Sequence, residues 1–205
     1  MPGIRSLSGM RDENPQDLKL RTKIHDSLRK HLSSHGYEAI DTPLLEPTDL
    51  FLRKSGGELA TRMYTFIDPG GNRVSIRPEF TASVIRYYLE RSSEESLPIR
   101  MQYGGPVLRY DESIGLKQFH QVGAELIGGA LSEYDGEILA LAQEGLSIIG
   151  SPDFTCVVGH VGVLQRMLDE LGLSHRTQAF LISSLSRGKQ NSEEVQNIRQ
   201  RAYSA

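Results

Sequence analysis

The alternation of polar and apolar positions predicts two strands joined by a polar loop within residues 101–128. In residues 119–127 a period of two places Gln121, Gly123 and Glu125 on one face. The side chains between them, mostly apolar, fall on the other face. This pattern is typical of a strand in an antiparallel sheet, with one face towards a core.

The first strand of the pair, residues 103–110, is predicted from its Gly, Pro, Val and aromatic content. Its period places Gly105, Val107 and Arg109 on one face. If that face coincides with the polar face of the second strand, three polar side chains converge over two glycines, which leave an open floor for a small ligand. Carboxylate, amide and guanidinium groups suit a zwitterion or an anion. A solvated strand face explains the pattern equally well.

Periodic apolar positions predict helices around the strands, over residues 15–35, 80–89, 138–149, 163–171 and 176–187. Asn14 as N-cap and Pro15 at the first helical position mark the start of the first helix, and Gly36 marks its end.

The remaining segments are predicted to be strands, turns and loops. Residues 37–46 are expected to be extended and residues 50–62 to form a mobile loop, and the turn at 69–72 joins a hairpin of residues 63–68 and 73–76. Residues 153–160 are interpreted as a buried strand, and residues 188–205 as a loosely held tail. Together these elements predict an α+β domain of antiparallel sheet and helices.

Two histidines on the first predicted helix raise the question of a metal site. His31 and His35 are four residues apart, so they share a helix face and could hold one ion. The sequence shows no third ligand, and a protein zinc site uses three or four. We therefore expect a solvated helix face and no metal.

Composition narrows the classes of protein. With 205 residues, the chain is long enough for one large domain or one and a half, and its net charge of −3 provides no basic field for nucleic acid. The single cysteine, Cys156, excludes an internal disulfide and a cysteine-built metal site. No apolar run reaches about 18 residues and no signal core precedes the first helix, so a cytoplasmic protein without a membrane segment is expected.

Five segments of the chain stand out: GMRDENPQD at 9–17, GYEAIDTPLLEPTDLF at 36–51, MYTFIDPGGNRVSIRPEFTASVIR at 63–86, GPVLRYD at 105–111 and QFHQVGAE at 118–125. Together they resemble the histidyl-tRNA synthetase family of class II aminoacyl-tRNA synthetases. In that family the first would be the opening segment, the second motif 1 with Pro43 as signature proline, the third the RPE-x-T histidine-binding segment, and the last two the halves of motif 2. The resemblance covers about residues 9–150.

This resemblance implies a class II synthetase-like antiparallel sheet flanked by helices, as a single catalytic-core domain over residues 1–205 with no anticodon-binding domain. It also implies a homodimer through the motif 1 elements. The implied histidine-binding residues are Glu79, Thr81, Arg109, Gln121 and Glu125. A local alternative for Glu79 and Thr81 is that they cap the helix that follows.

The sequence departs from the synthetase pattern where ATP would bind. If ATP binding is retained, the implied phosphate residues are Arg109, Asp111 and Lys117. Asp111 stands where synthetases carry Glu, the loop 112–117 is short, and Leu116 and Lys117 replace arginines. A lysine is a point charge without the bidentate fork of arginine, so weakened ATP chemistry is expected and no catalytic residue is assigned. Motif 3 and the second histidine-site segment of the family are not found.

The segment VVGHVGVLQRMLDELGL at 157–173 resembles one in the regulatory subunit of ATP phosphoribosyltransferase, a non-aminoacylating paralogue in the family. The Gly159-His160 pair carries that resemblance, although a histidine hydrogen-bonded to backbone is the simpler interpretation of His160.

Two functions follow from these resemblances. The first is a non-catalytic, histidine-sensing regulatory subunit that partners the short-form ATP phosphoribosyltransferase catalytic subunit in histidine biosynthesis, as a homodimer or larger hetero-oligomer and with no certain cofactor. The second is the catalytic-core fragment of a histidine–tRNA ligase, which would use Mg-ATP and tRNA. The altered motif 2 loop favours the first, whereas Glu79, which fits the synthetase pattern well, slightly favours the second. A stand-alone histidine-binding domain is a third interpretation.

Overall fold

The computed structural model describes residues 3–53, 61–91, 96–110, 117–129, 132–151 and 153–188, side chains of 183–188 excepted. The chain divides into two compact units, Met1–Phe154 and Thr155–Ala205. Both sheets and all five residues expected to bind histidine belong to the first unit. The single-domain organisation stays a prediction.

The first sheet has the order β1-β5-β6 and carries the pair of strands predicted from the alternation. β5 (Ile99–Leu108) and β6 (Gln118–Ile127) are antiparallel over ten residue pairs. The short β1 (Glu38–Ala39) runs parallel to β5 and extends the sheet at its other edge. The two long strands, β5 and β6, are antiparallel, so the sheet is mainly antiparallel, as predicted.

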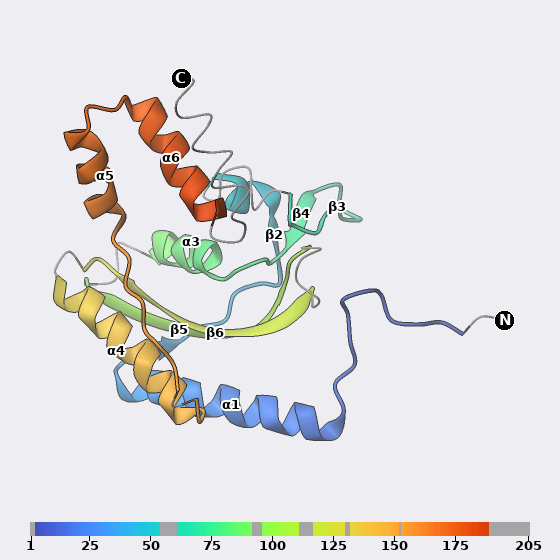
Figure 1. Ribbon diagram of the computed structural model, residues 1–205. Coiled ribbons are helices and arrows are strands. Elements are labelled where there is room, and N and C mark those ends of the chain that lie inside the picture. The colour runs from blue at the N-terminus through green and yellow to red at the C-terminus, as the bar shows by residue number, and fades with distance from the viewer. Residues whose placement is uncertain are drawn as a thin grey trace. The chain divides into compact units, whose positions relative to one another are not determined.

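Helices cover both faces of this sheet (Figure 1). α1 (Pro15–Ser34) and α4 (Ser132–Ile148) lie on one face, and α3 (Thr81–Arg91) lies on the other. Each face has its own cluster of buried apolar side chains: Phe80, Val84, Met101, Tyr103 and Val107 beneath α3, and Leu32, Tyr37 and Leu141 beneath α1 and α4. This arrangement confirms the α+β architecture with an antiparallel sheet flanked by helices.

The first helix begins and ends where its capping residues predict. The Asn14 side chain accepts hydrogen bonds from the backbone N–H groups of Gln16 and Asp17, each at 2.9 Å, and Pro15 follows as the first helical residue. Gly36 then adopts a φ of +81°, which an L side chain rarely tolerates. Local sequence signals therefore fix both ends of α1.

The second sheet has the order β2-β4-β3, with both pairs antiparallel. Its strands are β2 (Leu45–Pro47), β3 (Thr65–Ile67) and β4 (Arg73–Ile76). The predicted turn joins β3 to β4: the Asp68 carboxylate accepts from the Asn72 N–H at 2.8 Å, and Gly71 has a φ of +82°. β4 leads directly into the Arg77-Pro78-Glu79 segment and α3.

The predicted loop at 50–62 is wrong in its first part, because residues 48–53 are helical. The buried Phe51 side chain provides the apolar contact that favours this turn of helix over a loop. Residues 54–60 lie outside the described part of the chain.

The second unit contains α5 (Val161–Glu170) and α6 (His175–Gly188). The buried strand predicted at residues 153–160 is wrong: the described residues there are not in a strand, and Val157 is 84% exposed. An apolar run becomes a strand only where a neighbouring strand pairs with it, and none of the described strands does so here. Of the predicted tail at 188–205, only Gly188 is among the residues that the structure describes.

No helix in the described ranges has both the length and the apolar character required to cross a lipid bilayer.

Candidate functional site

The register of β5 and β6 decides whether the two polar faces coincide. Gly105 pairs with Gln121, and Tyr103 pairs with Gly123. Residues paired in this way point to the same side of a sheet. The face of β5 with Gly105 and the face of β6 with Gln121 therefore form one surface, which is the condition for the predicted site, and it is the face that α3 covers.

The open floor expected over the two glycines is wrong at Gly123. The phenol ring of Tyr103 lies across this glycine, so that a Cβ there would meet the Tyr103 hydroxyl at 2.5 Å and the ring at 2.6 Å. Gly105 is also approached closely, by Arg77 and Phe80. The glycines make room for protein side chains, because an aromatic ring commonly covers a glycine on the neighbouring strand.

Tyr103 is the member of this face that the sequence interpretation missed. Counting the period of two back from Gly105 by one step would have reached it. Its ring stacks on Phe80 with centroids 4.4 Å apart and an interplanar angle of 11°. Phe80 occupies the variable position of the RPE-x-T segment, so this stack links that segment to the sheet.

The segment is held in place by the buried guanidinium of Arg77. Arg77 donates to the Thr42 carbonyl at 2.7 Å and to the Pro106 carbonyl at 3.2 Å, and its Cζ lies 3.8 Å from the Phe80 ring centroid. Burial lowers the pKa of Arg77, and Asp41 at 3.7 Å opposes this. Arg77 thus anchors the strand end that presents Glu79 and Thr81.

Three of the predicted histidine-binding residues gather around the Tyr103 hydroxyl. The hydroxyl donates to Oε1 of Glu125 at 3.3 Å. Burial raises the pKa of Tyr103 well above its ordinary value, as do the negative charges of Glu125 and Glu79, whereas a hydrogen bond with Thr81 lowers it. The surroundings of the phenol are therefore electronegative, which favours a cationic group such as an ammonium.

Glu79 also caps α3, which was the alternative interpretation of this residue. Its Oε1 accepts from the Ala82 N–H at 3.0 Å, at the start of α3. A carboxylate offers two oxygens and about four acceptor positions, so one such bond leaves acceptor capacity for a ligand. Capping fixes the direction of the side chain and is compatible with binding.

Gln121 contributes a polar atom that lacks a partner. Its Oε1 is buried, and no described residue donates to it. An unsatisfied buried acceptor costs about 1–3 kcal/mol, so such an atom is expected where a ligand completes the hydrogen bonding. Its pairing with Gly105 places it on the same face as Tyr103.

Arg109 follows the end of β5 and binds the RPE segment. Its Nε donates to the Pro78 carbonyl at 2.7 Å, and its Cζ lies 5.2 Å from the Phe119 ring centroid. Pro78 immediately precedes Glu79. The structure thus brings the motif 2 arginine beside the same chain segment that supplies the carboxylate.

Of the other implied phosphate residues, Lys117 is described, and Asp111 lies outside the described residues, as does Leu116. The Lys117 carbonyl accepts from the Arg109 N–H at 2.8 Å, and its own N–H donates to Gly9 at 2.9 Å. Its Nζ lies 4.3 Å from the Tyr110 ring centroid, a cation–π contact. Lys117 is therefore fixed beside Arg109 by its backbone.

Comparison with known proteins connects this geometry to a family. A sequence profile described as histidyl-tRNA synthetase matches residues 9–204. The histidine–tRNA ligase of Methanocaldococcus jannaschii is 36% identical over 172 residues, 83% of this chain and 41% of the relative. That of Pyrococcus horikoshii is 34% identical over 197 residues, 95% of this chain and 46% of the relative. The chain thus spans less than half the length of these relatives.

Solved structures agree on the fold. A protein described as an ATP phosphoribosyltransferase regulatory subunit/histidyl-tRNA synthetase from Bacillus halodurans C has a TM-score of 0.83 at 25% identity, over 98% of this chain and 51% of that chain. A histidine–tRNA ligase subunit from Alicyclobacillus acidocaldarius has a TM-score of 0.79 at 29% identity, over 98% of this chain and 57% of that chain. The chain therefore belongs to the histidyl-tRNA synthetase family and has its class II synthetase-like core.

Proposed function

We propose that this chain binds free histidine on the face of β5 and β6 beneath α3. The observation that carries the proposal is the grouping of Glu79, Thr81 and Glu125 around the Tyr103 hydroxyl. Two carboxylates and two hydroxyls at one point form an acceptor-rich site, which suits the ammonium group of an amino acid.

The other groups assign the rest of the ligand. The unpartnered Gln121 Oε1 would accept a hydrogen bond from the same ammonium group or from the imidazole. Arg109 would bind the carboxylate, because it is the guanidinium held against the segment that carries Glu79. Histidine would then lie between an acidic end and a basic end of one surface.

We further propose that the chain acts as a non-catalytic, histidine-sensing regulatory subunit that partners a short-form ATP phosphoribosyltransferase. Support comes from the motif 2 loop, where Leu116 and Lys117 replace the arginines that grip ATP in synthetases. Of these two residues only Lys117 carries a charge, and its ammonium group lies over the Tyr110 ring. The structural neighbour from Bacillus halodurans C, whose name includes a regulatory subunit, adds support. Histidine binding would change partner activity through a coupling free energy between sites.

The second candidate is the catalytic core of a histidine–tRNA ligase, as the names of the curated relatives suggest. In that reaction the histidine carboxylate attacks the α-phosphorus of Mg-ATP, the bond to the β-phosphate oxygen breaks, and pyrophosphate leaves. Arg109 would neutralise the charge that develops on the α-phosphate. The chain spans 42% of the Methanococcus vannielii relative, so aminoacylation of tRNA would require the remainder of such a protein.

One pair of assays separates the two candidates. Histidine-dependent exchange of labelled pyrophosphate into ATP is measured with the wild-type chain and with Arg109→Gln. The activity of a short-form ATP phosphoribosyltransferase is measured with and without the chain, across a range of histidine concentrations. A regulatory subunit gives no exchange and makes the transferase histidine-sensitive. Exchange that disappears in Arg109→Gln, with no effect on the transferase, contradicts the regulatory role and supports the ligase core.

A further inference from the structure

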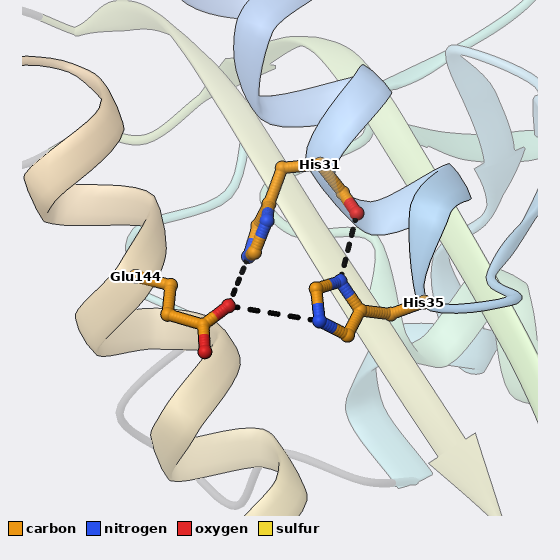
Figure 2. A group of neighbouring side chains, drawn as sticks. All are labelled: His31, His35 and Glu144. Atoms are coloured by element: carbon orange, nitrogen blue, oxygen red, sulfur yellow. Dashed lines mark hydrogen bonds and ion pairs between the residues drawn. The ribbon is translucent and has the colours of Figure 1, made fainter.

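A second cluster of functional groups lies on the opposite face of the sheet, between α1 and α4. Figure 2 shows the imidazoles of His31, in the last turn of α1, and His35, the residue just after α1, pointing towards the carboxylate of Glu144 on α4. Glu144 thus supplies the third potential ligand that the sequence did not show, and the expected solvated face is wrong for the buried His31 but not for His35, whose side chain is 42% exposed. Their partner comes from a helix more than 100 residues later, and the His31 side chain is only 7% exposed.

The distances fit a metal ion after a small adjustment. Oε2 of Glu144 lies 3.7 Å from Nε2 of His31 and 3.6 Å from Nε2 of His35, and one ligand atom from each of the three residues lies within 4.8 Å of the others. Zinc binds histidine nitrogen at about 2.0–2.1 Å, so tetrahedral ligands lie about 3.3 Å apart. Both distances to Glu144 are already close to this value, so the adjustment falls mainly on the separation of the two imidazoles, and the His35 side chain, which is 42% exposed, can supply it.

We propose that His31, His35 and Glu144 form a binding site for one divalent transition-metal ion, with Zn²⁺ as the preferred ion. Two imidazoles and one carboxylate are a ligand set that suits zinc, whereas magnesium and calcium prefer oxygen ligands alone. Three protein ligands leave the fourth position to water, and the exposed sides of His35 and Glu144 provide the route of entry.

Hydrogen bonds around His35 prepare it to ligate. Its Nδ1 lies 3.0 Å from the His31 carbonyl oxygen, so Nδ1 carries the proton and donates, which leaves the Nε2 lone pair facing Glu144. The same carbonyl accepts from the Ser34 hydroxyl at 2.7 Å. This arrangement is the backbone-oriented histidine commonly found at protein metal sites.

His31 requires one change on metal binding. Its Nε2 lies 3.3 Å from the Leu141 carbonyl oxygen, to which it donates in the metal-free protein. Ligation would replace that bond and place the proton on Nδ1. The metal-free cluster is thus satisfied by its own hydrogen bonds, and metal uptake exchanges one of them for a coordinate bond.

A metal ion at this site would link α1 to α4 on the face of the sheet opposite to α3. α1 and α4 both pack on the face opposite to the proposed histidine site, so a shared ion would hold these helices together without occupying the histidine-binding face. A ligand that binds only the folded state raises its stability. Zinc is therefore expected to raise the Tm of the chain and to leave histidine binding intact.

The test uses the full chain, without a histidine tag, stripped of metal, in a Cys156→Ser background that removes its only thiol. Zinc chloride is titrated by calorimetry, and Tm is measured with and without zinc. Cobalt chloride then provides a visible spectrum that reports coordination number. We expect one zinc per chain, a Tm raised by several degrees and a spectrum of four-coordinate cobalt.

Variants locate the ion. Glu144→Gln and His35→Gln are at partly exposed positions, and each is expected to weaken zinc binding by at least about tenfold and to abolish the rise in Tm. Glu133→Gln on the same helix and His175→Gln in the second unit are the matched controls, and both should bind zinc as the background does. Absence of zinc binding, or equal affinity in the Glu144 and His35 variants and the controls, would overturn the proposal.

Discussion

At the scale of single residues, the candidate site depends on a glycine that makes room for a ring. Replacement of Gly123 by Ala places a methyl group 2.5 Å from the Tyr103 hydroxyl and 2.6 Å from its ring. The ring must then leave its stack on Phe80. We expect Gly123→Ala to lower the free energy of unfolding by about 1–3 kcal/mol and to weaken histidine binding, as measured by urea denaturation and calorimetry.

Gly136→Ala is the matched control for this substitution. Gly136 lies within α4, and a Cβ there would meet nothing within 4 Å. Because alanine is the better helix former, this change should stabilise the chain by about 0.5–1 kcal/mol. If Gly123→Ala behaved like Gly136→Ala, the close approach of Tyr103 would not be a feature of the folded protein.

In the proposed site, binding of the histidine ammonium group would depend most directly on the carboxylate of Glu125. Glu125→Gln removes the charge but keeps an oxygen for the Tyr103 hydroxyl, which now bonds to Glu125 at 3.3 Å. A hydrogen bond to a charged group is worth about 1.5–3 kcal/mol, so histidine affinity should fall by roughly 10- to 100-fold with little loss of stability. Glu125→Ala should abolish binding. Unchanged calorimetric affinity in either variant would contradict the site assignment.

At the scale of elements, a carboxylate on α4 joins three parts of the first unit. Glu137 accepts from Nε and Nη2 of Arg100 on β5 at 2.8 and 2.7 Å, and from the Tyr37 hydroxyl, just after α1, at 2.8 Å. The Arg100 hydrogen bonds lower the pKa of Glu137 to about 2, with further help from Tyr37. Burial is the main cause that raises the pKa of Tyr37.

This pairing predicts a pH dependence of stability. Because the folded-state pKa of Glu137 lies below its ordinary value, the unfolded chain binds more protons between about pH 5 and pH 2. The stabilisation is therefore complete above pH 5 and is lost as the pH falls towards 2. Glu137→Gln should lower the unfolding free energy at pH 7 by about 1–3 kcal/mol and by much less at pH 3. A difference between the two proteins that is equal at both pH values would contradict the pairing.

Elements with local signals could be predicted from the sequence. The bounds of α1 follow from Asn14, Pro15 and Gly36, and the β3–β4 turn follows from Asp68 and Asn72. The alternation of polar and apolar positions predicts which residues of β5 and β6 share a face, although only the structure shows that Gly105 pairs with Gln121.

Features that depend on distant partners could not be predicted. The ring of Tyr103 over Gly123 depends on the strand register, and Glu144 meets His31 only because α1 and α4 share a face of the sheet. The apolar residues 153–160 have a strand-like composition but no strand beside them among the described residues. In each case the sequence supplies the side chain, and tertiary structure decides what it contacts.

At the scale of the whole molecule, the proposed functions are concentrated in one unit. Both sheets, all residues of the candidate histidine site and the His31–His35–Glu144 cluster belong to Met1–Phe154. We expect a chain ending at Phe154 to fold and to bind histidine within about threefold of the affinity of the full chain, because all five candidate residues belong to the first unit. Circular dichroism and calorimetry test this. A folded but non-binding fragment would show that Thr155–Ala205 contributes to the site.

We propose that this member of the histidyl-tRNA synthetase family binds free histidine through Glu79, Thr81, Arg109, Gln121 and Glu125. Calorimetric titration of the folded chain with histidine, with histidinol as the analogue that lacks the carboxylate, tests it most directly. We expect saturable binding of one histidine per chain, and weaker binding of histidinol because Arg109 loses its partner. A folded chain that gives no heat of binding with millimolar histidine would contradict this site.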